Sequence, residues 1–480
     1  MDRRTFLNAA ALGAVVATVP WLTTTSASAT TQGVTVNSLT ALQNAINSAT
    51  PGTVITLANG DYTVPAGGQI TVANKNGDED FPITIVSQSR GGAILRGENT
   101  FVISNSSWIT ISGFSLRQST TLDIAPSNSH IRLTRNDLQF ADIEGLHWVM
   151  VRADDTKVDR NHFHNKTTLG IFLGVEGDGD TAMAQRVHIY RNYFSDHFFP
   201  GDNGGEPIRL GISKRALSVA GATVEYNLFE RANGDPEAIS VKSSGNTIRN
   251  NTIRNSIGGI VLRHGNGTRV ESNYILDGKE GIRIYGNDHV IVNNYLSGLT
   301  DPKSRALVVG SGTERDHVPG ESDAARRGND AADRVLIAHN TLLNNTSTLS
   351  GETSRPFEPS FCKIVDNLFV GATGDLVAMG NTTSFTWSGN ILYGAAADGN
   401  IPAGTFTRAN PLLAVGSDGI SRLLAGSPAI NAATYSPAPV TTDLDGQTRG
   451  SQRDVGADEY STCGPCAHPL TTADVGPNAP

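Results

Sequence analysis

The chain has 480 residues, including 51 glycines, 37 lysines and arginines, and 46 aspartates and glutamates. The net charge of −9 argues against general nucleic-acid binding, so an anionic polymer would have to bind at a local cationic cluster. Helical periodicity is nearly absent, and elongated β architectures of this length can form a single domain.

The first 29 residues have the pattern of an export signal. Arg3 and Arg4 precede a modest apolar run that ends at the small residues Ala27-Ser28-Ala29. A twin arginine before such a run indicates export in the folded state. The run is too short and too rich in alanine to span a bilayer well. We therefore predict a twin-arginine signal peptide over 1–29 and a secreted mature protein that is soluble.

A repeat dominates the middle of the chain. Asparagine followed by two mostly apolar or aromatic residues returns, mostly at intervals of about 21 to 35 residues, at Asn136, Asn161, Asn192, Asn227, Asn251, Asn273, Asn294, Asn340, Asn367 and Asn390. A short alternating strand precedes each asparagine, which at a turn tolerates the left-handed conformation and can bond to the next coil. We predict an all-β fold, a right-handed parallel β-helix over 30–400. A propeller or sandwich would instead repeat two-residue hairpin turns.

Segments outside the repeat are expected to cover the two ends of this solenoid. The stretch from Leu39 to Ser48 predicts an amphipathic N-terminal capping helix. The repeat is lost over 401–480, which we expect to pack across the other end as an irregular cap and tail. Cys463 and Cys466 form a CxxC with no second pair, which favours a local disulfide over a zinc or redox site. Cys362 is expected to be a buried free thiol.

Four short strands combine alternating apolar residues with a cation. The strands lie at 208–210, 239–242, 260–263 and 282–284, and their cations are Arg209, Lys242, Arg263 and Arg283. Alternate residues of a strand share a face, and neighbouring coils stack at roughly 5 Å. We therefore predict that the four side chains occupy equivalent outward positions. A cationic ladder of this kind suits an anionic polysaccharide.

Two carboxylates precede the second of these strands. Asp235 and Glu237, at i and i+2, can face the same side, which requires a kink between Glu237 and Ile239 to keep the glutamate out of the core. Calcium takes such hard oxygen ligands. Elimination from a uronate needs its carboxylate neutralised, a base for the C5 proton and an acid for the leaving oxygen. A lysine can be that base where nearby positive charge lowers its pKa.

From about residue 50 to residue 300 the sequence resembles polysaccharide lyase family 6, the β-helix family of alginate lyases and chondroitinase B. The resemblance rests on the segments 203–211, 225–251, 262–266 and 281–286. It implies that Lys242 is the base and Arg263 the acid. It further implies Ca²⁺ ligands at Asn203, Asp235 and Glu237, and substrate-binding side chains at Arg209, His264, Arg283 and Tyr285. Asp235 stands where the family usually has glutamate, and we expect Glu206 to orient Arg209 rather than to bind the ion.

These features predict a secreted lyase that binds alginate and cleaves it by β-elimination, leaving 4,5-unsaturated uronate ends. A dermatan or chondroitin sulfate lyase is an alternative, although only Arg315, Arg326 and Arg327 would supply additional arginines for sulfate. A uronan C5-epimerase and a non-catalytic polysaccharide-binding β-helix are others. We expect a monomer without nucleic-acid or membrane partners. Block preference and endo or exo action stay open, with the insertion at 312–333 a candidate for closing one end of the cleft.

Overall fold

The computed structural model describes residues 32–201, 203–435 and 440–480. The predicted signal peptide lies outside the described residues. Within them, no helix has the length and apolarity to cross a membrane.

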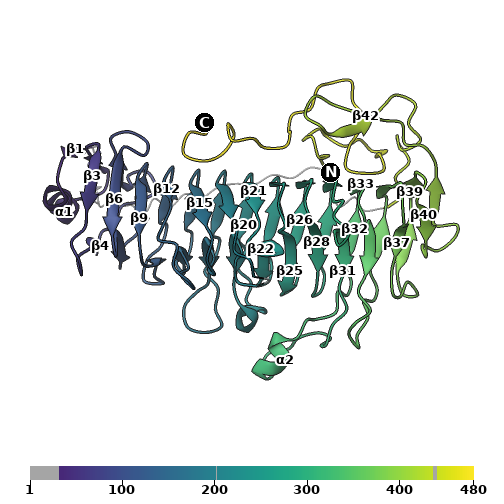
Figure 1. Cartoon of the computed structure of the whole chain (residues 1–480), viewed down its shortest axis with the longest axis horizontal. Coiled ribbons are helices and arrows are strands. Elements are labelled where there is room, and N and C mark those ends of the chain that lie inside the picture. Colours follow the sequence, from purple (N-terminus) through teal and green to yellow (C-terminus); the bar gives the residue numbers. More distant parts are fainter. Residues whose placement is uncertain (1–31, 202, 436–439) are drawn as a thin grey trace, which may run out of the picture.

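The chain coils into three long parallel sheets, each coil contributing one strand to each sheet in turn (Figure 1). Sheet A contains β1 (Gln32–Val36), β2 (Thr53–Leu57), β5 (Ile83–Ser87), β8 (Ile109–Ser112), β11 (Arg132–Thr134), β14 (Lys157–Asp159), β17 (His188–Tyr190), β20 (Thr223–Glu225), β23 (Thr247–Arg249), β26 (Arg269–Glu271), β29 (Val290–Val292), β32 (Leu336–Ala338), β35 (Lys363–Val365) and β38 (Thr386–Ser388). Sheet B contains β3 (Gly60–Thr63), β6 (Ala93–Gly97), β9 (Ser115–Gln118), β12 (Asp137–Leu138), β15 (His162–Lys166), β18 (Tyr193–His197), β21 (Leu228–Ala232), β24 (Thr252–Arg254), β27 (Tyr274–Leu276), β30 (Tyr295–Ser297), β33 (Thr341–Leu343), β36 (Leu368–Val370), β39 (Asn390–Tyr393) and β41 (Phe406–Arg408). Sheet C contains β4 (Ile70–Ala73), β7 (Phe101–Ser104), β10 (Leu122–Ile124), β13 (Val149–Val151), β16 (Leu173–Val175), β19 (Ile208–Leu210), β22 (Glu237–Lys242), β25 (Gly259–His264), β28 (Glu280–Ile284), β31 (Arg305–Val309), β34 (Leu349–Gly351), β37 (Asp375–Ala378) and β40 (Ala397–Gly399). This is the predicted parallel β-helix.

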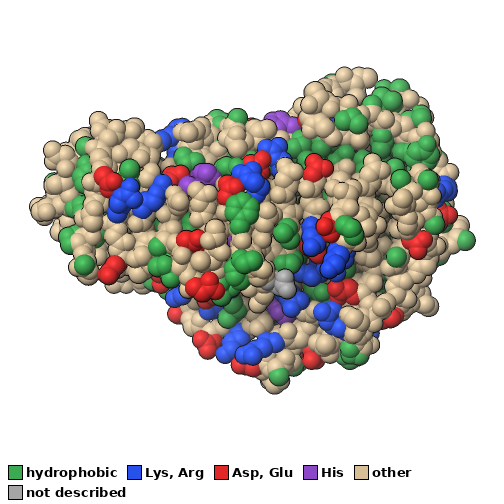
Figure 2. Space-filling model, in the orientation of Figure 1, with side chains coloured by type: hydrophobic (Ala, Val, Ile, Leu, Met, Phe, Trp, Pro, Cys, Tyr) green, Lys and Arg blue, Asp and Glu red, His purple; other side chains and the backbone are tan. Residues whose placement is uncertain are grey.

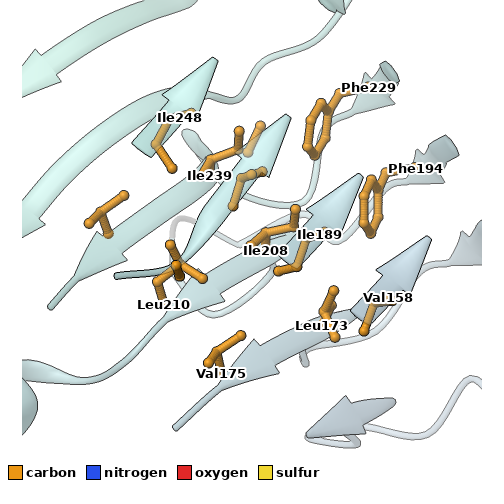
Figure 3. Close-up of a cluster of buried hydrophobic side chains, with 14 of the residues drawn as sticks. Val158, Leu173, Val175, Ile189, Phe194, Ile208, Leu210, Phe229, Ile239 and Ile248 are labelled. Carbon is orange, nitrogen blue, oxygen red and sulfur yellow. The ribbon is translucent and has the colours of Figure 1, made fainter. Parts of the chain in front are cut away.

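The core is a set of stacked apolar rows inside the coils. In sheet C, Ile208 pairs with Ile239, which pairs with Ile260 in the next coil, and all three are buried. Figure 3 shows such rows from the three sheets meeting in the interior, with Phe194 and Phe229 stacked at a centroid distance of 4.9 Å. Each fully buried apolar side chain contributes about 1.5–3 kcal/mol. Because alternate residues of a strand point to opposite faces, the residues between these core positions point away from the interior.

The repeated asparagines form a continuous ladder at the turn between sheets A and B. Each Nδ2 donates to the Oδ1 of the asparagine one coil further on, over 2.9–3.1 Å, from Asn136 to Asn390. The predicted bond to the next coil is confirmed. The left-handed residue, however, is the one before each asparagine, such as Arg135, Tyr226 or Asp366. The prediction that the asparagine itself is left-handed was wrong, because its side chain must point inward to reach the next rung.

The predicted capping helix is present as α1 (Leu39–Ser48), with Leu42 and Ile46 buried against the first coils. The Ser38 side chain caps its N-terminus by accepting from the Ala41 amide at 3.2 Å. Gln43 Nε2 donates to the Thr71 carbonyl at 2.9 Å, and the Thr71 amide donates back to Gln43 Oε1 at 2.8 Å. The helix thus satisfies the outer edge of β4, the first strand of sheet C.

The C-terminal segment is irregular, as predicted, but takes a different path. After a small antiparallel pair, β42 (Leu413–Val415) and β43 (Ser421–Leu423), it turns back along the flank of sheet B (Figure 1). Arg135 Nη1 donates to the carbonyl of Ala479 at 2.6 Å, far from the end that we expected the segment to cover. The physical reason is apolar side chains that face outward on sheet B, such as Leu228 and Tyr274, which need this cover.

The three cysteines are free thiols in the structure. Cys362 is buried, as predicted, and burial raises the pKa of its thiol to about 12. Cys463 and Cys466 are exposed and not bonded to each other, so the predicted disulfide is not present in this structure.

Candidate active site

The four predicted cations lie on the outer face of sheet C, but in two rows rather than one. The register aligns Arg209 with Ser240, Val261 and Arg283 across four coils. Arg209 and Arg283 directly follow the aligned isoleucine of their own strands. Lys242 and Arg263 lie further along, three residues after the aligned isoleucine of theirs. The prediction of equivalent positions was therefore wrong. The two rows together spread positive charge along the strands as well as across them.

A break in the strand pairing separates Lys242 and Arg263 from the regular ladder. Val241 pairs with Leu262, but Lys242 pairs with His264, so Arg263 is an extra residue in β25. A β-bulge of this kind re-aims a side chain, and such bulges are over-represented next to active sites. A second register shift lies between Glu237 and Ile239. The predicted kink at that position is confirmed.

Lys242 is held by a buried carboxylate. Its Nζ lies 3.1 Å from Glu206 Oε1, and the Glu206 side chain is 1% exposed. Burial alone would raise the pKa of Glu206, but Lys242 and Arg209 hold that pKa below its usual range. The second oxygen, Oε2, finds no hydrogen-bond partner among the described residues. The prediction that Glu206 orients Arg209 was therefore wrong: Glu206 contacts Lys242, and the Arg209 guanidinium lies 3.7 Å from Glu176 Oε1.

Arg263 differs from its neighbours because nothing neutralises it. Across the residues that the structure describes, it makes no ion pair or hydrogen bond, and its guanidinium lies 5.7 Å from the centroid of the Tyr285 ring. Arg283 and Arg355 approach the same ring at 6.0 and 5.3 Å. Cations over an aromatic face are attracted to its electron density. Tyr285 thus collects three positive charges at the margin of sheet C.

Tyr285 is held by a carboxylate, Glu352, that the sequence did not predict to be part of the site. Its hydroxyl donates to Glu352, whose Oε2 lies 2.9 Å away, and Glu352 also pairs with Arg305 and Arg355. Burial raises the pKa of Tyr285, so the hydroxyl stays protonated and donates. Glu352 and Arg355 follow β34, at the same margin of sheet C as Lys242 and Arg263. Their position just after a strand of sheet C was the available sequence signal for a place in the site. They belong to no repeated motif that would have drawn attention to it.

Three carboxylates surround the start of β22. Asp235 Oδ2 accepts from the Gly204 amide at 2.8 Å, which ties it to the loop of the exposed Asn203. Glu237 Oε1 lies 3.3 Å from Arg283 Nη2, and its other oxygen accepts from Ser240. Burial, with the negative charges of Glu206 and Glu237, raises the pKa of Asp235 to about 7. The structure thus brings Asp235 and Glu237 together, with Asn203 at the rim.

The donor types at this cluster fit a hard cation. Burial and the negative charges of Glu206 and Glu237 raise the pKa of Asp235, and Glu206 Oε2 has no hydrogen-bond partner among the described residues. The predicted ligands therefore fit Ca²⁺ in chemistry. Within the described chain, the groups of three ligand atoms that lie within 4.8 Å of one another are elsewhere, at Asp137, His162 and His164 and at Asp443, Asp445 and Asp458.

His264 lies behind Lys242, at the edge of the insertion. It is only 4% exposed, and burial together with Arg263 lowers its pKa to about 3, so the imidazole is neutral. Its ring lies 6.5 Å from that of His317 in the insertion. The insertion carries α2 (Asp323–Arg327), which meets η1 (Ser213–Arg215) through an Asp323–Lys214 contact of 3.4 Å. It therefore forms a wall beside the cations.

Charged side chains of both signs gather on the face between the middle coils and α2 (Figure 2). Arg315 lies 3.0 Å from Asp333, and Arg326 pairs with Glu321. Two of the three arginines that would have to bind sulfate are thus neutralised within the insertion itself, whereas Arg327 has no ion pair among the described residues. The unneutralised charge of Arg263 lies instead on β25.

A family model described as chondroitinase B matches residues 36–355. Among solved structures, a mannuronic acid specific polysaccharide family 6 lyase from human gut microbiota is 24% identical, with a TM-score of 0.70 over 79% of this chain and 91% of that chain. The PL6 family alginate lyase AlyGC is 26% identical, with a TM-score of 0.72 over 90% of this chain and 59% of that chain. A PL6 alginate lyase in complex with a trisaccharide is 21% identical, with a TM-score of 0.62 over 82% and 91%. No curated protein matches the sequence.

Proposed function

This chain belongs to the chondroitinase B family and to polysaccharide lyase family 6, and is a polysaccharide lyase; we propose that its substrate is alginate, which it cleaves by β-elimination. The observation that carries the proposal is the arrangement at the bulge of β25. There a lysine held by a buried carboxylate lies one coil from an arginine with no ion pair or hydrogen bond to any described residue. A base and an acid on adjacent coils can act on the C5 proton and on the oxygen that leaves the neighbouring carbon.

Lys242 is proposed as the base that takes the C5 proton of the uronate. Once protonated, its ammonium remains 3.1 Å from Glu206 Oε1, so the buried carboxylate stabilises the charge that the step creates. Arg263 donates an N–H to the glycosidic oxygen as the bond to it breaks. Because no described carboxylate engages its guanidinium, all of its donors are free for the substrate.

Arg209 and Arg283 are proposed to orient the substrate, because they lie in one row across four coils and each retains donors beyond its single contact with a glutamate. His264 and Tyr285 complete the site. The His264 imidazole is neutral and lies at the edge of the insertion, and the Tyr285 ring lies 5.7 Å from the Arg263 guanidinium. Asn203, Asp235 and Glu237 would hold Ca²⁺, which when bound supplies positive charge to neutralise the uronate carboxylate.

Two of the insertion's three arginines are already paired, which favours alginate over sulfated glycosaminoglycans. Arg315 and Arg326 are engaged by Asp333 and Glu321, and only Arg327 of the three has no ion pair among the described residues, whereas a sulfated chain needs several free cations along the cleft. The similar AlyGC structure is described as an alginate lyase. We further propose export through residues 1–29 and action outside the cell as a monomer, which N-terminal sequencing of the secreted protein and its elution volume would check.

The direct test is the ultraviolet absorbance of the unsaturated uronate when the protein is mixed with alginate. Dermatan sulfate and a chelator-treated sample run alongside. We expect product from alginate only, and less of it after chelation if Asp235 and Glu237 hold an ion. Product from dermatan sulfate alone would overturn the proposal that alginate is the substrate. Hydrogen exchange at C5 without absorbance would replace the lyase with an epimerase.

A further inference from the structure

A second group of potential ligands lies on sheet B, away from the lyase site. Asp137 is in β12, and His162 and His164 are in the neighbouring β15. Asp137 pairs with His162 in the register, and His162 and His164 share one face because they are two residues apart on a strand. One ligand atom from each residue lies within 4.8 Å of the other two.

The spacing of the three atoms suits a small ion. Asp137 Oδ2 lies 3.0 Å from His164 Nε2 and 3.8 Å from His162 Nδ1. Tetrahedral coordination at zinc-like bond lengths of about 2.0–2.2 Å places ligand atoms roughly 3.3–3.6 Å apart. The observed distances bracket that range, so small side-chain rotations would be enough.

Two other polar atoms of these residues, on Asp137 and His162, are held in the way that metal ligands usually are. Arg117 engages Asp137 Oδ1 and leaves Oδ2 toward the imidazoles. His162 Nε2 lies 3.0 Å from Ser195 Oγ; by donating its N–H there it keeps the Nδ1 lone pair for an ion. The His162 ring is also stacked between His164 at 4.2 Å and Tyr193 at 4.4 Å. Its orientation is therefore fixed before any ion arrives.

The cluster is reachable from solvent. The side chains of Asp137, His162 and His164 are 26%, 24% and 13% exposed. An ion could enter and keep a fourth position for water. Two imidazoles and one carboxylate prefer zinc, cobalt, nickel or copper, whereas calcium prefers oxygen alone.

We propose that Asp137, His162 and His164 bind a divalent transition-metal ion of the zinc type, clamping two adjacent coils of sheet B. This site is separate from the carboxylates beside Lys242 and does not depend on the substrate of the enzyme. The Arg117 guanidinium is the one opposing charge in contact with the ligands among the described residues, and it lowers the affinity without blocking Oδ2.

The test is titration of the full mature chain with Co²⁺, whose visible absorption reports four-coordinate binding, and with Zn²⁺ in competition. Cys463→Ser and Cys466→Ser form the background, because these exposed thiols could bind the same ions. We expect one equivalent of Co²⁺, displaced by Zn²⁺, and a higher melting temperature when the ion is bound. His164→Ala and the gentler His164→Gln should each weaken binding at least about tenfold.

His188→Ala is the matched control. His188 is also a partly exposed histidine that contacts a carboxylate, Glu225, across coils at 2.7 Å, but it belongs to no three-ligand group in the described structure. Its variant should bind Co²⁺ like the background protein. The proposal is overturned if no saturable binding is seen, or if the His164 variants bind as tightly as the His188 variant.

Discussion

The asparagine ladder and the outer margin of sheet C use the same coils in opposite ways. In the ladder one residue type fills every rung, and each amide bonds to the next at 2.9–3.1 Å. At the margin of sheet C two register shifts interrupt the pairing, and Glu206 Oε2 and His264 Nδ1 find no partner in the described structure. Regularity satisfies polar groups, and interruption leaves them available to a ligand.

The same contrast holds for charge. The arginines of sheets A and B are mostly neutralised across coils, as Arg254 is by Glu230 at 2.6 Å. Arg263 has no such partner on the described face, and the pKa of Asp235 is raised to about 7 by burial and by its acidic neighbours. Uncompensated charge of both signs within one site is typical of functional positions rather than of structural ones.

Removal of the unpaired Arg263 should have a large effect on activity. We expect Arg263→Ala to lower the rate of alginate cleavage by about 10³-fold, the middle of the range for loss of a general acid. Arg254→Ala, which removes a neutralised arginine from sheet B, is the control and should keep most activity. Comparable losses in both variants would mean that charge pairing does not distinguish the two regions.

The ladder should respond in stability instead. Asn251→Ala removes the bonds to Asn273 and to the Val224 carbonyl and leaves the Asn227 amide unpaired. We expect a loss of about 3 kcal/mol in the free energy of unfolding, measured in denaturant, with unchanged activity per folded molecule. Asn44→Ala on the exposed face of α1 is the control, expected within about 0.5 kcal/mol of the parent. An Asn251 variant of parental stability would contradict the structural role of the ladder.

Asp235 should make stability depend on pH. A carboxyl whose folded-state pKa is raised to about 7 favours the folded state when protonated; this contribution is present below about pH 4 and lost as the pH rises through 7. Chelated protein should therefore lose roughly 2 kcal/mol between pH 5 and pH 8. Asp235→Asn should flatten the pH dependence of stability. Added Ca²⁺ should restore the stability of the parent protein at pH 8 but not that of the Asp235→Asn variant. A flat profile in the chelated parent would remove the argument for excess negative charge there.

The smallest effect is expected at Tyr285. Tyr285→Phe keeps the ring beneath the three arginines and deletes only the hydroxyl bond to Glu352. We expect substrate binding to weaken by about 1 kcal/mol, which would be seen as a several-fold rise in KM with little change in kcat. A large fall in kcat would instead place the hydroxyl on the reacting atoms.

The regular parts of the coils could be predicted from the sequence, and the interrupted margin of sheet C could be predicted only in part. The ladder asparagines, α1 and the kink after Glu237 were predicted because each rests on a local period or on side-chain parity. The common row of four cations was wrong because Arg209 and Lys242 sit at different offsets along their strands, and the bulge at Arg263 shifts the pairing of β25 further. A register between coils is a tertiary property that no single strand encodes.

The remaining misses involve contacts between distant segments. Glu206 pairs with Lys242 rather than Arg209, and Glu352 reaches Tyr285 over 67 residues of sequence. The tail follows sheet B because Leu228 and Tyr274 face outward there and need cover. Three-dimensional proximity decides each case, and neither composition nor spacing reports it.

The most direct test of Lys242 as the base compares Lys242→Ala with Lys214→Ala. Lys214 lies near the same insertion, and its ion pairs among the described residues are with Asp180 and Asp323, at 3.9 and 3.4 Å. The measurement is the release of unsaturated uronate from alginate by each variant at matched melting temperature. We predict no detectable product from the Lys242 variant and near-parental product from the Lys214 variant. Undiminished cleavage by a folded Lys242 variant would contradict the assignment of Lys242 as the base.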